Sequence, residues 1–67
     1  MTSADIVVRY LALNGAQSRS EIARGAGLRL QTVCGAVPRI ARRIHSVAKR
    51  WDPETCRMVE LLDVRRR

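Results

Sequence analysis

The sequence has few aromatic residues, few cysteines and no long apolar run. Tyr10 and Trp51 are the only aromatic residues, and there is no Phe. The two cysteines, Cys34 and Cys56, are too few for the disulfide framework of a small secreted protein. No stretch approaches the roughly 20 apolar residues that a membrane-spanning helix needs. The first five residues lack the basic region of a signal peptide, so we expect a cytoplasmic protein without a membrane partner.

Recognisable catalytic and metal-binding patterns are also missing. The sequence has no Ser/His/Asp set at a credible spacing, no phosphate-cradling glycine loop and no paired carboxylates beside an apolar cleft. Cys34, His45 and Cys56 are each eleven residues apart, whereas zinc ligands usually come in pairs two to four residues apart. A chain of 67 residues leaves little room for a substrate pocket. We therefore expect no enzyme activity, cofactor, metal or small-molecule substrate.

Acidic residues are absent from the middle of the chain, between Glu21 and Asp52. The whole chain has 13 Lys and Arg against 6 Asp and Glu, a formal net charge of +7, and all but one of the cations are Arg. The cations in the acid-free segment are Arg24, Arg29, Arg39, Arg42, Arg43, Lys49 and Arg50. Cations without a counter-charge attract phosphates, and the planar guanidinium fits a phosphate or a guanine edge through two hydrogen bonds.

The length of the chain limits it to one domain with a small core. A core of this size supplies at most roughly 3–5 kcal/mol of net stability. Homodimerisation or the binding of a partner would supply the rest, and both remain open at this point.

The segment 29–44 has the pattern of an amphipathic helix. Its apolar residues recur at helical spacing: Val33, Ala36, Val37, Ile40 and Ile44. The opposite side is polar or basic, without a carboxylate: Arg29, Gln31, Thr32, Gly35, Arg39, Arg42 and Arg43. Because such a face suits a polyanion, we interpret the segment as a DNA-recognition helix.

Pro38 interrupts this pattern. It lacks a backbone donor and crowds the carbonyl of Cys34, four residues earlier. Two structures are therefore open: the helix bends near 34–38, or it ends near Val37 and a second segment begins at Pro38.

Two shorter helices are expected before this segment. The first covers about residues 4–13, with Ser3 as its N-cap, and Asn14-Gly15 ends it. Ser18 or Ser20 caps the second, and Ser18 with Glu21 fits a capping box. The sequence 25–28 then turns the chain, because Gly tolerates positive φ.

After residue 43 the pattern predicts a β-hairpin. Residues 44–51 and 56–64 are read as strands, joined by a turn at 52–55 with proline in second position. A helix over 54–64 is the competing interpretation. Trp51 either wedges at a DNA backbone or packs over the hairpin and the helices. Residues 65–67 are expected to be a disordered basic tail.

Three short motifs are in register with one another: Glu21-Ile22-Ala23, Gly27-Leu28 and Thr32-Val33. Together they resemble the helix-turn-helix of bacterial winged-helix regulators, over about residues 18–44. The resemblance implies an α+β fold across residues 1–64: a three-helix helix-turn-helix bundle followed by a two-stranded β-hairpin wing.

The charge pattern and the resemblance favour sequence-specific binding of double-stranded DNA by a small transcriptional regulator of a bacterial or mobile-element (phage-type) genome, in the bacterial cytoplasm or nucleoid. The expected DNA-binding residues are Ser18, Arg19, Arg29, Gln31, Thr32, Gly35, Arg39, Arg42, Arg43, Lys49, Arg50 and Arg57. Three alternatives stay open. They are an excisionase-like architectural protein that bends DNA, a winged-helix module that docks on an acidic protein, and a binder of structured RNA.

Overall fold

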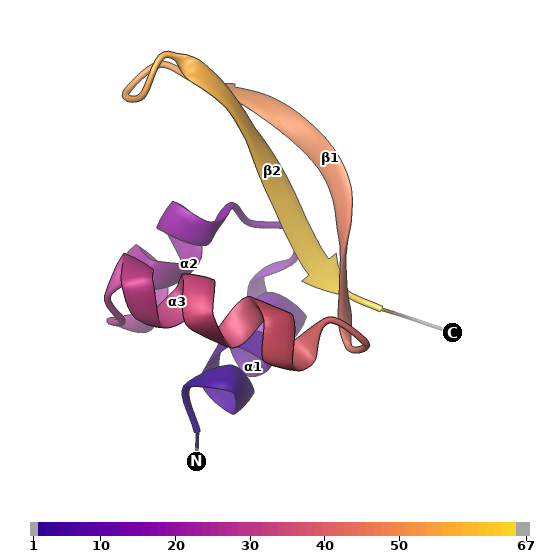
Figure 1. Ribbon diagram of the computed structural model, residues 1–67. Coiled ribbons are helices and arrows are strands. Elements are labelled where there is room, and N and C mark those ends of the chain that lie inside the picture. The colour runs from indigo at the N-terminus through magenta and orange to yellow at the C-terminus, as the bar shows by residue number, and fades with distance from the viewer. Residues whose placement is uncertain (1, 66–67) are drawn as a thin grey trace.

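A computed structural model describes residues 2–65 of the chain (Figure 1). Three α-helices and a short 3-10 helix precede two antiparallel strands, which is the α+β architecture that the sequence predicts. The elements are α1 (Ser3–Asn14), α2 (Arg19–Ala26), α3 (Leu30–Ala36), η1 (Val37–Ile40), β1 (Ile44–Asp52) and β2 (Arg57–Val64). None of the helices in residues 2–65 is long and apolar enough to cross a membrane.

The first helix begins one residue earlier than predicted, because Thr2 and not Ser3 is its N-cap. Asp5 stands three residues after Thr2, so the two residues form a capping box: the Thr2 side chain accepts from the Asp5 backbone, and the Asp5 carboxylate accepts from the Thr2 backbone. Ser3 would need such a residue at position 6, which is Ile6. The helix ends at Asn14, as predicted.

The predicted capping box of α2 is confirmed. The Ser18 hydroxyl accepts from the Glu21 N–H, and the Glu21 carboxylate accepts from the Ser18 N–H at 3.1 Å. Gly27 ends the helix in the left-handed conformation, with φ 70° and ψ 30°, where a Cβ would be strained. The turn lets Leu28 pack against the core and α3 begin directly after Arg29.

The α-helical part of α3 ends at Ala36, and the chain continues through Pro38 as the 3-10 helix η1. Of the two structures that Pro38 left open, a bent helix and an early end, the structure has the early end, because Pro38 cannot donate the next α-helical hydrogen bond. The 3-10 segment keeps the same side of the chain inward, so Val33, Ala36 and Ile40 are all buried. Ile44, however, lies on no helix: it is the first residue of β1.

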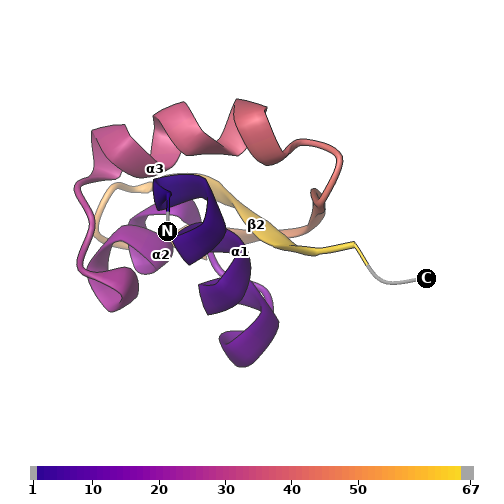
Figure 2. The ribbon, with the colours of Figure 1, turned by 90° about the horizontal axis from the view of Figure 1, so that it is seen from below.

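Residues 57–64 form a strand, so the competing helix over 54–64 is wrong. The antiparallel register runs from Ile44 opposite Val64 at the base to Asp52 opposite Arg57 at the tip. A bulge between Ser46 and Ala48 interrupts the ladder. Because bulges bend a strand and increase its twist, this irregularity accompanies the curved path of the hairpin over the helices (Figures 1 and 2).

All three α-helices, η1 and the base of the hairpin contribute to the core. The buried apolar residues are Val7, Leu11, Ile22, Ala23, Val33, Ala36, Ile40, Ile44 and Leu62. Leu62 also forms an isolated antiparallel bridge with Gln17, through backbone hydrogen bonds of 2.9 and 2.8 Å. The base of the hairpin is thus fixed to the bundle, whereas its distal half contributes no buried residue.

Candidate nucleic-acid interface

One side of α3 is inward and the other is open to solvent. Val33 and Ala36 are buried, whereas Gln31 and Gly35 are exposed and Thr32 is half-buried. Together with Arg39, these three positions line a groove of about 400 Å³ against the first residues of α1. The groove contains hydroxyl, amide and guanidinium groups and no carboxylate among its lining residues. The part of α3 predicted to read DNA is therefore accessible.

A second groove, of about 440 Å³, separates α2 and α3 from the distal half of the hairpin. Leu30 and Cys34 of α3 line one side, and Lys49, Arg57 and Met58 of the hairpin line the other. Figure 1 shows the hairpin arching over this region. The hairpin therefore borders the exposed surface of α3, as a wing beside a recognition helix would.

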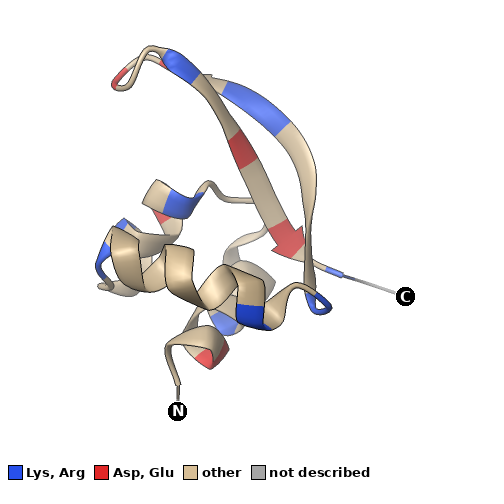
Figure 3. Cartoon of the chain, viewed as in Figure 1, with Lys and Arg blue, Asp and Glu red and all other residues tan. Residues whose placement is uncertain are grey.

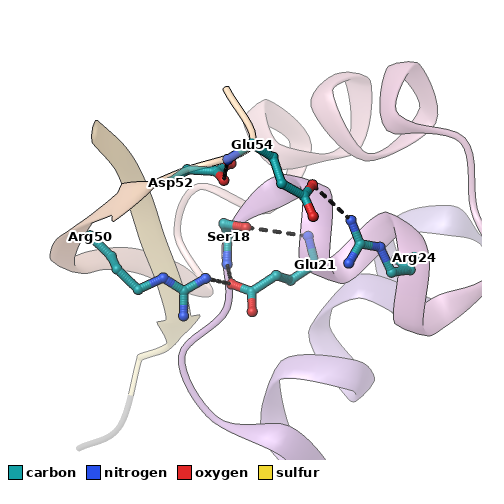
Figure 4. Close-up of polar contacts among 6 residues, drawn as sticks. All are labelled: Ser18, Glu21, Arg24, Arg50, Asp52 and Glu54. Carbon is teal, nitrogen blue, oxygen red and sulfur yellow. Dashed lines mark hydrogen bonds and ion pairs between the residues drawn. The ribbon is translucent and has the colours of Figure 1, made fainter. Parts of the chain in front are cut away.

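Four cations form ion pairs with acids that lie outside the acid-free segment of the sequence. Arg50 Nη2 lies 2.6 Å from Glu21 Oε1, and Arg19 Nη1 lies 3.0 Å from Glu60 Oε1. The pairs Arg24–Glu54 and Arg43–Asp5 are both 3.5 Å long. The expectation that this segment lacks counter-charges is therefore wrong in the folded protein, because folding brings acids from α1, α2 and the hairpin turn to three of its seven cations. Figure 3 marks the charged residues along the chain, and Figure 4 shows the pairs Arg50–Glu21 and Arg24–Glu54.

Hydrogen bonds and these cations lower the pKa of three carboxyl groups. For Asp5 the main cause is the hydroxyl of Thr2, and for Glu60 it is the guanidinium of Arg19. Partial burial of Glu21 by itself raises its pKa, but the two hydrogen bonds from Ser18 and the charge of Arg50 outweigh it and lower the pKa overall. The three carboxylates stabilise the fold in their charged forms.

Five of the cations that were predicted to contact DNA make no ion pair within residues 2–65: Arg29, Arg39, Arg42, Lys49 and Arg57. All five are exposed. Arg29 precedes α3, Arg39 is on η1 and Arg42 is in the following turn, so these three are close in sequence to the open face of α3. They are the cations that a phosphate can reach without displacing a carboxylate.

Two other predicted residues have structural roles. Ser18 is only 5% exposed, and its hydroxyl accepts from the Glu21 N–H at the start of α2, so its side chain is already engaged in the fold. Arg65, predicted to begin a disordered tail, donates from Nε to the Ile44 carbonyl at 3.1 Å. The remaining tail residues, 66 and 67, lie outside the described residues.

The expected DNA-binding residues include none of the large apolar residues of this surface, and Trp51 was named only separately, as one that could wedge at a DNA backbone. Leu30, Met58 and Trp51 are 49%, 55% and 56% exposed. More than half of the Trp51 side chain is therefore open to solvent, and Met58 is its partner on the neighbouring strand. The sequence could have indicated that Trp51 lies beside Lys49, because residues two positions apart in a strand share one face.

No set of three or more His, Cys, Asp or Glu residues among residues 2–65 is arranged to hold a metal ion. Cys34 and Cys56 are both free thiols at exposed positions. Comparison of the sequence with models of known protein families finds no match, and no curated protein is significantly similar to it.

Proposed function

We propose that this protein binds double-stranded DNA sequence-specifically, with α3 in the major groove and the hairpin beside the adjacent phosphate backbone. The observation that carries the proposal is the open, carboxylate-free face of α3, where Gln31, Thr32 and Gly35 stand between unpaired cations. A major groove admits one α-helix, and the glutamine amide has the donor and the acceptor that recognise adenine.

The parts of this surface divide between two kinds of contact. Gln31 and Thr32 lie in the first turn of α3, where helix-turn-helix proteins present side chains to base edges. Gly35 has open space around its Cα, so it lets the helix approach the groove floor without offering a side chain. The phosphate contacts, which position the protein without reading sequence, are Arg29, Arg39, Arg42, Lys49 and Arg57.

The role that fits such a molecule is a small transcriptional regulator of a bacterial or mobile-element genome, acting in the cytoplasm. Binding at an operator would be sufficient to occlude a promoter, so no catalytic step is needed. The net charge of +7 supports attraction to nucleic acid in general.

The test is a selection from a random pool of duplexes with the full chain, followed by affinity measurements on the enriched site. We expect one recurring sequence, and an affinity for it at least about 1000-fold above that for scrambled duplex. Duplex RNA of the same sequence serves as a competitor. Enrichment of no sequence, or equal competition by RNA, would contradict the proposal.

A further inference from the structure

Two large apolar side chains lie directly opposite each other near the tip of the hairpin. Trp51 of β1 pairs with Met58 of β2, and each is more than half exposed. Side chains of directly opposed residues project from the same face of a sheet. The next pair on this face is Lys49 opposite Glu60. The apolar pair is therefore part of one surface, continuous with a cation.

The core does not account for this pair. The hairpin contributes Ile44 and Leu62 to the core, and both are at its base. Trp51 and Met58 are remote from them along the ladder, with the bulge of β1 between. A hairpin that only touched phosphates would need no exposed tryptophan, because a phosphate offers no apolar surface. The pair is thus suited to a partner with apolar surface of its own.

The charges around the pair indicate that this partner is anionic. Lys49 is on the same face as the pair, and Arg57 lines the same groove as Met58; neither forms an ion pair within residues 2–65. Two of the nearby acids form ion pairs, Glu54 with Arg24 and Glu60 with Arg19, and the third, Asp52, is on the other face of the hairpin. Nucleic acid combines a continuous negative backbone with the apolar faces of its bases.

The location of the pair relative to α3 indicates which part of DNA it meets. Met58 lines the same groove as Leu30 and Cys34 of α3. If α3 occupies the major groove, the groove between helix and hairpin straddles a phosphate strand, and the far side of that strand is the adjacent minor groove. Proteins that bend DNA insert apolar side chains between base steps from the minor groove.

We propose that Trp51 and Met58 form a wedge that partly unstacks a base step from the minor groove and bends the DNA. This inference rests on the proposed DNA binding. The bend is expected within the range of about 20–90° that such wedges produce. Preferred sites would carry a flexible TA or CA/TG step at a fixed distance from the bases read by α3.

The experiment uses the full chain on its selected duplex, labelled at both ends for energy transfer, together with the emission of Trp51, the sole tryptophan. On binding, we expect quenched Trp51 emission and closer DNA ends. In the variant with Trp51→Ala and Met58→Ala, the bend is expected to be lost and the affinity to fall by roughly 5–150-fold. The salt dependence should not change, because no cation is removed.

Leu13→Ala is the matched control, because Leu13 is an exposed apolar residue on α1, 77% accessible, and should leave bend and affinity unchanged. Trp51→Phe keeps an aromatic wedge and should retain the bend. If the wild type binds its site with unchanged Trp51 emission and a straight duplex, this inference is overturned while DNA binding stands. If the wild type binds no duplex, the proposed function fails as well. A Trp51 emission change caused by raising protein concentration without DNA would indicate self-association and would also overturn the wedge.

Discussion

Arg50 Nη2 lies 2.6 Å from the Glu21 oxygen that also accepts the backbone N–H of Ser18 at 3.1 Å (Figure 4). One carboxylate thus closes the first turn of α2 and holds the distal hairpin over the helices. The Arg24–Glu54 pair adds a second link between α2 and the turn of the hairpin. The position of the hairpin relative to α3 therefore depends on α2, and Arg50 is engaged before any phosphate arrives.

Glu21→Gln is expected to lower the free energy of unfolding by about 0.2–1 kcal/mol in low salt, because the pair with Arg50 is partly exposed. Glutamine is accepted in a capping box, so the helix cap should survive. Chemical denaturation at low and high salt measures the effect, and the difference should shrink in high salt. The control is Glu54→Gln, whose pair is more exposed. An equal loss at both salt concentrations would argue against the ion pair as the cause.

Acid should destabilise the protein. The folded-state pKa values of Asp5, Glu21 and Glu60 lie below their ordinary values of 3.8 and 4.5. The stability that these carboxylates supply is therefore complete above the unfolded-state pKa and is lost as the pH falls through the folded-state pKa. Thermal melting from pH 7 to pH 3 should show a constant Tm above about pH 6 and a decline below about 4.5. A Tm that rises on acidification would contradict these assignments.

Gly25 should not tolerate a side chain. A Cβ at this position of α2 would overlap the Tyr10 ring of α1, coming within 2.7 Å of Cε2. Gly25→Ala is expected to cost about 1–3 kcal/mol despite the better helix propensity of alanine. Denaturation of the variant in the wild-type and Tyr10→Ala backgrounds measures the coupling between the two residues. The cost should largely disappear when the ring is absent, and Gly35→Ala, in open space, should not be destabilising.

Local patterns predicted most of the fold. The Ser18–Glu21 capping box, the left-handed Gly27 and the turn before β2 each depend on residues within a few positions of one another. Pro38 was compatible with a bent helix or with an early end of the helix, because its effect depends on whether the residues that follow it can still bury Ile40. The bridge between Gln17 and Leu62 carries no local signal, because it joins segments 45 residues apart.

The candidate site was less predictable for the same reason. Its cations were identified from charge pattern, but their partners are distant in sequence: Arg19 and Glu60 are separated by 41 residues. Ser18 was assigned to DNA although the capping box already engaged it. The exposure of Trp51 and Met58 depends on the curved path of the hairpin over the bundle, which the sequence of neither strand specifies alone.

The salt dependence of DNA binding should reflect the cations that make no ion pair. With about five phosphate contacts, the slope of log K against log[salt] is expected to be roughly −4 to −5. Arg42→Ala should make the slope shallower by about 1 and weaken selected and scrambled duplexes alike. Arg50→Ala should change the slope less, because Glu21 already neutralises that side chain. A slope near zero would indicate a protein partner instead.

Sequence reading by α3 is tested by comparing the affinities of wild type and Gln31→Ala for the selected site and for scrambled duplex. Gln31 is exposed in the first turn of α3, and glutamine can bind adenine through two hydrogen bonds. We predict a loss of about 1–3 kcal/mol on the selected site and little change on scrambled DNA. Lys49→Ala, which removes a phosphate contact, should weaken both. Equal losses on the two duplexes for Gln31→Ala would contradict sequence reading by α3.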